Sequence, residues 1–294
     1  MRELVVISGK GGTGKTSVVA SFAALASRPV LADCDVDAAD LHLVLTPTVR
    51  ERHEFRSGYE AVIRQADCVG CGGCLAHCRF DAVVMDANAE GNRRFTIDPV
   101  ACEGCGVCVR FCPVKAIDFP ERQTGEWYVS DTRFGPMVHA RLRIAAENSG
   151  KLVSVVRQEA RRVAESSDRD LVIVDGPPGI GCPVIASLAG ASMVLIVTEP
   201  TVSGEHDLER VLGLARHFGI RSAVCVNKWD INAEMTDGIE GKAAAAGAVL
   251  AGRITYDPAV TRAQIVGQSV VECGDGPAAN GLRELWERIC RMIS

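Results

Sequence analysis

Residues 9–16 of this 294-residue chain read Gly9-Lys10-Gly11-Gly12-Thr13-Gly14-Lys15-Thr16. The stretch matches the phosphate-binding pattern G-x-x-x-x-G-K-[ST] at every fixed position. A buried-strand pattern at 4–8 precedes it and a helical pattern at 17–27 follows it. Because strand, glycine loop and helix come in the order that the motif requires, the sequence predicts a nucleotide-binding loop rather than a glycine turn without function.

The same loop predicts which residues contact the nucleotide. Glycines allow backbone N–H groups to surround the phosphates, while the Lys15 ammonium reaches the β- and γ-phosphates. The Thr16 hydroxyl is expected to bind Mg²⁺. The predicted nucleotide contacts in this stretch are Gly9, Gly11, Gly12, Thr13, Gly14, Lys15, Thr16 and Ser17.

Short apolar runs alternate with helical patterns through most of the chain. The expected strands are 4–8, 30–33, 171–175, 193–198, 223–227 and 249–254, and the expected helices include 17–27, 147–166, 184–189 and 204–218. Continuous apolar strands that alternate with helices indicate a parallel sheet covered on both faces. The predicted fold class is therefore α/β, a doubly wound parallel-sheet P-loop NTPase.

Two runs of four cysteines interrupt this alternation. They are Cys68, Cys71, Cys74 and Cys78, then Cys102, Cys105, Cys108 and Cys112, the last followed by Pro113. Both have the spacing C-x2-C-x2-C-x3-C, with which bacterial ferredoxins hold two [4Fe–4S] clusters. Because the fourth cysteine of each run ligates the other cluster in such proteins, one predicted ligand set is Cys68, Cys71, Cys74 and Cys112, and the other is Cys102, Cys105, Cys108 and Cys78.

Zinc binding is the alternative for these cysteines, although structural zinc sites prefer paired C-x2-C units. Residue Arg79 follows Cys78 where ferredoxins usually have proline.

Each run precedes a short apolar strand pattern, 82–85 or 116–119, which indicates an internal repeat. The predicted domains are a discontinuous ATPase domain, 1–58 and 121–294, and an inserted α+β two-cluster ferredoxin-like domain, 59–120.

Composition narrows the partners and the compartment. The net charge of −5 gives no basic surplus for neutralising nucleic-acid phosphates, so we expect no nucleic-acid partner. The first residues lack a signal-peptide pattern, and no apolar stretch reaches the ~20 residues that span a bilayer. Thirteen cysteines without a secretory context indicate a reducing, cytoplasmic setting.

The chain resembles the MinD, ParA, Mrp and nitrogenase iron protein superfamily, and most closely its members with an inserted ferredoxin domain. The resemblance rests on Lys10, which marks the deviant Walker A loop, and on four further stretches. These are Asp33-Cys34-Asp35-Val36-Asp37, Asp175-Gly176-Pro177-Pro178-Gly179, Thr198-Glu199-Pro200-Thr201 and Asn148-Ser149-Gly150-Lys151. It covers nearly the whole chain outside the cysteine segment.

The resemblance implies roles for particular residues. Lys10 would reach across a homodimer to the partner's nucleotide, and Lys15 would bind the phosphates of its own. Asp35 would position the attacking water, a role for which Asp33 and Asp37 compete. Asp175 would hold Mg²⁺ through water and sense the γ-phosphate. Such groups suit phosphoryl transfer because that reaction needs positioning and charge neutralisation.

The base of the nucleotide is predicted from Asn227-Lys228-Trp229-Asp230. The pattern N-K-x-D reads guanine in GTPases, through the aspartate. The resemblance instead implies ATP, with Asn227 at the adenine. We favour ATP and keep GTP as the alternative.

Five cysteines lie outside the two runs. Cys182 follows Asp175 by seven residues, the offset of a cluster ligand in nitrogenase iron protein, so a third cluster is the alternative to a free thiol. We expect Cys34, Cys225, Cys273 and Cys290 to fill the core. The amphipathic C-terminal pattern, 282–293, is expected to pack on the core rather than on a membrane.

The predicted function is a cytoplasmic iron–sulfur ATPase with low intrinsic turnover, in which ATP switches a homodimer and gates electron transfer through two [4Fe–4S] clusters. The insertion is expected to leave the sheet directly after Asp35, which would tie the clusters to the switch. The alternatives are a cluster-assembly carrier, although a C-terminal C-x-x-C is absent from the sequence, and a MinD- or ParA-like positioning switch with the clusters as redox sensor. The resemblance also implies two partners, a paralogous MinD-like ATPase and a small protein like nitrogenase-cofactor binders.

Overall fold

The computed structural model describes residues 1–87, 93–143 and 149–294, which separate into two compact units. The first unit consists of Met1–His53, Glu126–Leu142 and the C-terminal half of the chain. The second consists mainly of Glu54–Gly125. Each unit has its own cluster of buried apolar side chains, as structural domains do.

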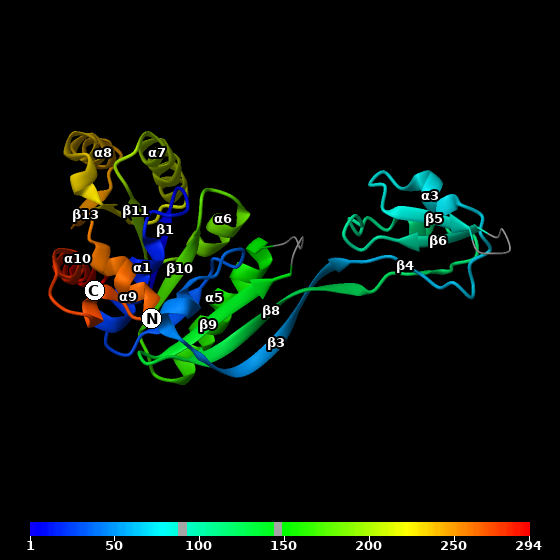
Figure 1. The fold of residues 1–294 in the computed structure, drawn as a ribbon, viewed down its shortest axis with the longest axis horizontal. Coiled ribbons are helices and arrows are strands. Elements are labelled where there is room, and N and C mark those ends of the chain that lie inside the picture. The colour runs from blue at the N-terminus through cyan, green and yellow to red at the C-terminus, as the bar shows by residue number, and fades with distance from the viewer. Residues whose placement is uncertain (88–92, 144–148) are drawn as a thin grey trace. The chain divides into compact units, whose positions relative to one another are not determined.

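A nine-stranded sheet forms the centre of the first unit, with the order β13-β12-β11-β1-β10-β2-β9-β8-β3 (Figure 1). The strands are β1 (Arg2–Ser8), β2 (Val30–Asp33), β3 (Thr48–Tyr59), β8 (Glu121–Asp131), β9 (Pro136–Leu142), β10 (Leu171–Pro178), β11 (Met193–Thr198), β12 (Ser222–Asn227) and β13 (Val249–Ile254). All neighbouring pairs from β13 to β9 are parallel. This sheet confirms the predicted doubly wound α/β class.

Helices connect these strands. They are α1 (Lys15–Leu25), α2 (Leu41–Leu45), α5 (Ser149–Ser166), α6 (Cys182–Leu188), α7 (Val202–His217), α8 (Ala233–Ala245), α9 (Pro258–Ile265) and α10 (Pro277–Ile293), with 3₁₀ turns η1 (Trp229–Ile231) and η2 (Val270–Glu272). The expected helix 147–166 corresponds to α5. Its first two residues, and with them Asn148 of the family resemblance, lie outside the described residues.

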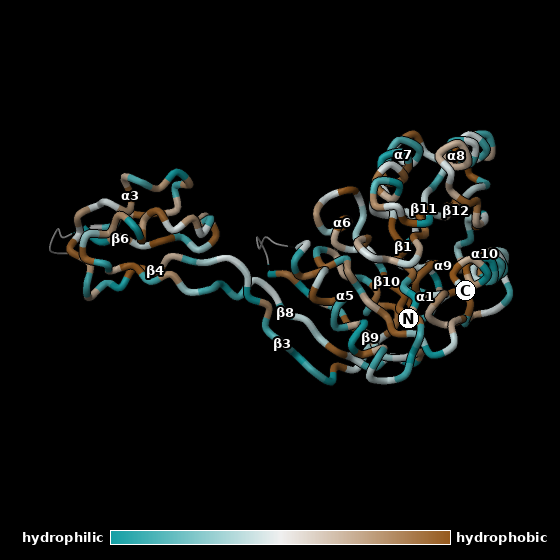
Figure 2. Tube along the Cα trace, turned by 180° about the vertical axis from the view of Figure 1, so that it is seen from behind, coloured by the Kyte–Doolittle hydropathy of each residue, from teal (hydrophilic) through white to brown (hydrophobic). Residues whose placement is uncertain are grey.

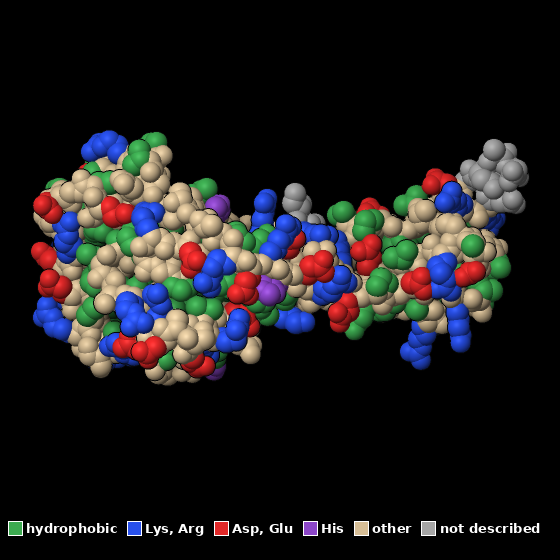
Figure 3. Space-filling view, turned by 90° about the horizontal axis from the view of Figure 1, so that it is seen from below, with side chains coloured by type: hydrophobic (Ala, Val, Ile, Leu, Met, Phe, Trp, Pro, Cys, Tyr) green, Lys and Arg blue, Asp and Glu red, His purple; other side chains and the backbone are tan. Residues whose placement is uncertain are grey.

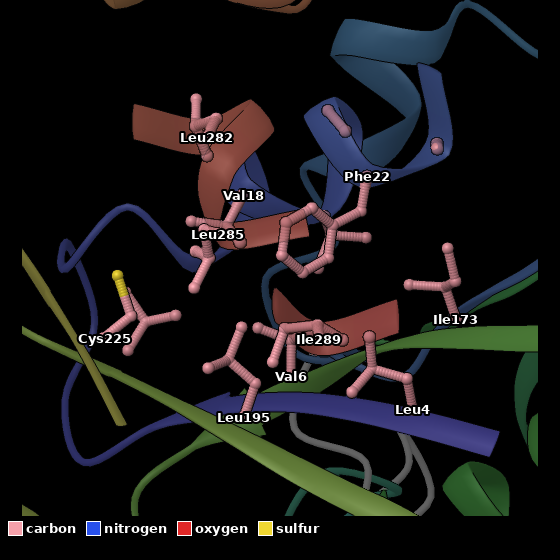
Figure 4. Close-up of a cluster of buried hydrophobic side chains, with 14 of the residues drawn as sticks. Leu4, Val6, Val18, Phe22, Ile173, Leu195, Cys225, Leu282, Leu285 and Ile289 are labelled. Atoms are coloured by element: carbon pink, nitrogen blue, oxygen red, sulfur yellow. The ribbon is translucent and has the colours of Figure 1, made fainter. Parts of the chain in front are cut away.

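Apolar side chains of one sheet face pack against α1 and α10 (Figure 4). Leu4 and Val6 of β1 alternate with residues of the other face, as strand geometry requires. Phe22 of α1 is fully buried, which contributes about 1.5–3 kcal/mol. Leu282, Leu285 and Ile289 of α10 join the same cluster, so the predicted packing of the C-terminal helix on the core is confirmed.

The second unit contains two small antiparallel pairs and two short helices. Strands β4 (Val62–Ile63) and β7 (Ile117–Asp118) form one pair, and β5 (Val83–Ala87) and β6 (Arg93–Ile97) form the other. The helices are α3 (Gly73–His77) and α4 (Val107–Arg110). Each cysteine run thus contains one short helix and precedes one short strand, β5 or β7, as the internal repeat predicts.

The expectation that the chain leaves the sheet directly after Asp35 is wrong. Helix α2 and strand β3 follow Asp35, and β3 itself joins the sheet as its last strand. Strands β8 and β9 were also not predicted; they are joined by the turn 132–135, so they must run antiparallel. The sequence hides β3 because most of its side chains are exposed and polar, as its hydrophilic colour in Figure 2 shows.

Charged side chains of both signs are interspersed on the face of the first unit shown in Figure 3. This mixture agrees with the small net charge of −5. Among residues 1–87, 93–143 and 149–294, no helix has the length and apolar character that crossing a membrane requires.

Candidate functional site

The phosphate loop joins β1 to α1 in a conformation that depends on glycine. Gly14 precedes the first helical residue, Lys15, with φ of 89°, and Gly12 has φ of 81°. Both values lie in the left-handed region that glycine tolerates. A Cβ at Gly11 or Gly12 would meet no atom within 4 Å, so this side of the loop is open to a ligand.

Lys15 points from the loop to two carboxylates, one on β10 and one just after the neighbouring strand β2. Its Nζ lies 2.5 Å from Asp175 Oδ1 and 3.5 Å from Asp35 Oδ2. Burial would lower the pKa of Lys15, but the charge and hydrogen bond of Asp175 outweigh burial and raise that pKa. Lys15 is therefore a buried cation at the site where phosphate oxygens are expected.

Asp33 and Asp175 lie opposite each other on β2 and β10. The Oδ2 atom of each is buried and has no hydrogen-bond partner among the described residues. Burial, together with the charge of Asp175, raises the pKa of Asp33 well above its usual range. Burial also raises the pKa of Asp35, although Lys15 opposes that shift. Carboxylate oxygens and the Thr16 hydroxyl are the hard ligands that Mg²⁺ prefers, so this donor set fits the ion.

A cavity of about 450 Å³ opens beside the loop. Loop residues from Gly11 to Ser17 line one side, and Asp35 lies at the strand ends. The other lining residues include Asn227, Lys228, Thr255, Tyr256, Asp257 and Gln264. Gly9 does not line the cavity. It lies against α7, where an added Cβ would come within 2.3 Å of Asp207 Cβ.

Of the N-K-x-D stretch, Asn227 and Lys228 line this cavity, but Asp230 does not. Asn227 Nδ2 donates to the Thr13 carbonyl at 2.8 Å, and Lys228 Nζ donates to the Gly12 carbonyl at 3.2 Å. Asp230 does not line the cavity; its Oδ1 accepts from the Tyr256 backbone N–H at 2.7 Å. Asn227 and Lys228 therefore support the loop, while Asp230 fixes the segment that follows β13.

Lys10 points away from the cavity toward the end of β11 and the start of α7. Its Nζ lies 2.7 Å from Glu199 Oε1, 3.0 Å from Thr201 Oγ1 and 2.9 Å from Ser203 Oγ. The lysine is thus bound within its own chain.

The cysteines of the second unit border two separate cavities. One is lined by Cys68, Cys71, Cys74 and Cys112. The other is lined by Cys78, Cys102, Cys105 and Cys108. Each cavity therefore receives three cysteines from one run and the last cysteine of the other run. Among the described residues, no three His, Cys, Asp or Glu side chains converge on a single metal ion.

The two cavities have related surroundings. Gly72 and Gly106 precede α3 and α4 with φ of 75° and 71°. Burial raises the pKa of the Cys74 and Cys108 thiols, which lie in these helices. The Ala116 N–H lies 3.2 Å from Cys112 Sγ. Thiol donors facing a shared cavity, with a backbone N–H at one sulfur, fit an iron–sulfur cluster.

The remaining cysteines differ in exposure. Cys34 and Cys225 are buried, as predicted for core residues. Cys273 is exposed, so its expected core role is wrong; it follows η2, and its thiol contacts Gln268 Oε1. Cys182 is exposed at the first residue of α6, and a third cluster there stays a prediction.

Known proteins resemble both parts of the chain. Residues 49–130 match the family model described as a 4Fe-4S dicluster domain. The chain is 34% identical over 235 residues to the uncharacterised protein MJ0578 of Methanocaldococcus jannaschii, covering 78% of this chain and 79% of that protein. It is 22% identical over 313 residues to the uncharacterised MJ0579 of the same organism, covering 100% and 99%.

Solved structures share the fold. The cell-division ATPase MinD of Pyrococcus furiosus matches with a TM-score of 0.60 at 18% identity over 99% of each chain. The chain belongs to the same family as MJ0578, has the fold of MinD, and contains a segment that matches a 4Fe-4S dicluster domain. A further similar structure is MinD of Pyrococcus horikoshii complexed with Mg-ADP, with a TM-score of 0.59 at 17% identity over 99% of this chain and 96% of that one.

The chain therefore combines a MinD-like fold and a phosphate-loop sequence with a segment that matches an iron–sulfur domain. Two residues that line the cavity, Lys228 and Gln264, were given no role from the sequence. Lys228 lies within the N-K-x-D stretch, but no role followed from its spacing; Glu199, which binds Lys10 and Lys228 outside the cavity lining, was likewise unassigned. Gln264 Nε2, which donates to Ser17 Oγ at 2.8 Å, had no sequence signal because it comes from a helix that follows the last strand.

Proposed function

We propose that ATP binding and hydrolysis switch this protein between monomer and homodimer and gate electron transfer through two [4Fe–4S] clusters to a partner. One observation carries the proposal. In one chain, Lys15 points toward Asp175 and Asp35. The eight cysteines of the two runs surround two cavities, each lined by three cysteines of one run and the last cysteine of the other. The proposal therefore joins a nucleotide switch and an electron carrier in one polypeptide.

At the nucleotide, Lys15 neutralises phosphate charge and Asp35 orients the attacking water. Thr16 and Asp175 would hold Mg²⁺, which would neutralise negative charge on the transferring phosphoryl group. The unpartnered, buried Oδ2 of Asp175 supports this assignment. Lys10 would serve the nucleotide of the partner, so a single chain lacks one cation and turns over slowly. Asn227 would contact the adenine.

In the ferredoxin domain, Cys68, Cys71, Cys74 and Cys112 would hold one cluster, and Cys102, Cys105, Cys108 and Cys78 the other. Such clusters carry single electrons at potentials set by charge, hydrogen bonds and exposure. A reducing cytoplasm would keep these eight thiols from forming disulfides, so that they could bind iron. The boundaries 59 and 120 for this domain stay part of the proposal.

The chain that returns from the cysteine segment offers a route for coupling. Strand β9 pairs in parallel with β2, and its His139 lies opposite Asp33. The Leu142 N–H also approaches the Val36 carbonyl, 3.4 Å away, in the segment that carries Asp35. A γ-phosphate that orders this segment would therefore act on β9, which the turn 132–135 joins to the preceding strand β8.

Two alternative functions also have support. The exposure of Cys71 and Cys105, one at each cavity, favours a cluster-assembly carrier. The MinD-like fold favours a positioning switch with the clusters as redox sensor. The proposed partners are a second copy of this chain, a paralogous ATPase and a small protein like nitrogenase-cofactor binders. No nucleic-acid or membrane partner is proposed.

Anaerobic purification followed by sedimentation tests the proposal. The protein should contain about eight iron and about eight sulfide per chain. It should sediment as a dimer with a non-hydrolysable ATP analogue and as a monomer with ADP. Stoichiometric zinc, or a nucleotide-independent mass, would contradict it.

A further inference from the structure

Lys10 is fully satisfied by acceptors in its own chain. An ammonium group has three N–H donors. Three acceptor oxygens surround Lys10 Nζ, those of Glu199 at 2.7 Å, Ser203 at 2.9 Å and Thr201 at 3.0 Å. No N–H of Lys10 is therefore left for a phosphate oxygen until at least one of these contacts breaks.

The start of α7 holds one of these acceptors, Thr201, in place. Thr201 Oγ1 also accepts from the Gly204 N–H at 3.0 Å, which caps the helix, and Thr198 Oγ1 donates to the Gly204 carbonyl at 3.0 Å. The backbone before Lys10 is fixed as well, because Gly9 lies against Asp207 without room for a Cβ. Release of Lys10 must therefore be a movement of its side chain.

Glu199 is the charged residue among the three acceptors around Lys10 Nζ. Its Oε1 faces Lys10, and its Oε2 accepts from Lys228 Nζ at 2.9 Å. Burial would raise the pKa of Glu199, but the hydrogen bonds from the two lysines outweigh burial and lower that pKa, so the group is ionised.

The carboxylate also offsets an unfavourable position of the lysine. The N-terminus of a helix carries positive partial charge, which disfavours an ammonium group there. Lys10 lies at the N-terminus of α7, and Glu199 supplies the compensating negative charge. Without that charge, Lys10 would be bound there by neutral acceptors alone.

We propose that Glu199 is a positioning residue that retains Lys10 in its own chain and thereby sets the ATP concentration at which the protein dimerises. The proposal rests on the proposed role of Lys10 at the partner's nucleotide. Lys10 must exchange the Glu199 carboxylate for a phosphate of the partner. Lys228 remains beside Glu199 during this exchange, because it is also bound to the Gly12 carbonyl.

The test is nucleotide-dependent sedimentation of the anaerobically purified full chain carrying Glu199→Gln. Glutamine keeps the size and one acceptor but removes the charge. The variant should half-dimerise at an about tenfold lower concentration of a non-hydrolysable ATP analogue, as expected for the loss of one charge-assisted contact. Ser203→Ala, which removes a neutral acceptor, should shift the midpoint in the same direction but less. The control Glu209→Gln, also on α7, breaks a contact with Lys242 of α8 and should leave the midpoint unchanged.

Nucleotide affinity, measured at protein concentrations too low for dimers, separates this role from an effect through Lys228. It should be unchanged in Glu199→Gln. An unshifted dimerisation midpoint in that variant, or a shift matched by an equal gain in monomer affinity, would overturn the proposal.

Lys10→Ala distinguishes failure of this inference from failure of the proposed function. That variant should not dimerise, and the double variant Lys10→Ala/Glu199→Gln should behave like it. If Lys10→Ala dimerises as the unaltered protein does, the role of Lys10 at the partner's nucleotide is wrong. If it does not dimerise while Glu199→Gln shows no shift, only the role of Glu199 is wrong.

Discussion

Lys15 Nζ lies 2.5 Å from Asp175 Oδ1, so the cation of the phosphate loop is paired with a carboxylate of the central strand β10. Both side chains are nearly inaccessible to solvent. A phosphate group that enters the cavity must compete with Asp175 for this ammonium. The contact therefore joins nucleotide binding to the strand that contains residues 176–178.

Replacing Lys15 with alanine should abolish hydrolysis and weaken nucleotide binding by roughly tenfold or more, the loss expected for a charge-assisted hydrogen bond. Titration calorimetry with an ATP analogue checks the binding, and phosphate release checks the hydrolysis. The control Lys242→Ala removes an exposed lysine of α8 and should change neither quantity. Wild-type hydrolysis by Lys15→Ala would contradict the assignment.

The cysteine assignment predicts which variants resemble one another. Cys112→Ala should lose the same cluster as Cys71→Ala, although 41 positions separate them in the printed sequence, because both residues line one cavity. Cys78→Ala should resemble Cys105→Ala for the same reason. Electron paramagnetic resonance of the reduced proteins distinguishes the two clusters. A spectrum of Cys112→Ala that matched Cys105→Ala would refute the interleaved arrangement.

Local patterns of residues predicted much of this structure. Buried strands such as β1 and β10 are continuous apolar runs, and the loop at 9–16 has a fixed spacing, so both could be read without tertiary information. Strand β3 could not, because an edge strand exposed to solvent keeps polar residues such as Arg50 and Glu51. Nor could the contact of Lys10 with Glu199, since 189 positions separate the two residues and only the packing of α7 beside the loop brings them together.

The identity of the base can be decided by competition. We expect ATP to displace a fluorescent nucleotide at lower concentration than GTP does, and Asp230→Ala to leave that order unchanged, because Asp230 binds the Tyr256 backbone instead of lining the cavity. Asn227→Ala should weaken both nucleotides, since its side chain supports the loop at Thr13. A GTP preference that disappears in Asp230→Ala would show that the site reads guanine.

Stability should fall in acid through His139. Burial, with a smaller effect of His42, lowers the pKa of His139 from 6.5 to about 4. Between pH 4 and 6.5, His139 therefore binds a proton in the unfolded chain but not in the folded chain. The free energy of unfolding that is present above pH 6.5 is lost as the pH falls toward 4. The loss is at most about 3 kcal/mol.

Urea unfolding at pH 7 and pH 4.5 measures this dependence. In the unaltered protein His139 Nε2 lies 2.8 Å from Ser130 Oγ, and His139→Gln places an amide that can retain that contact. The variant should show a smaller loss of stability between the two pH values. An equal loss in both proteins would show that other groups cause the acid sensitivity.

The central claim is that nucleotide state controls the clusters, and redox titration of one preparation under three conditions tests it most directly. With a non-hydrolysable ATP analogue, the midpoint potential or the rate of electron transfer to an external acceptor should differ from the values with ADP and without nucleotide. The Asp35→Asn variant should bind ATP and stay dimeric, because it lacks the group that orients water. With ATP it should show the same potential and transfer rate as the unaltered protein shows with the analogue. Identical potentials and identical transfer rates in all three states would contradict gating and favour the carrier or sensor function.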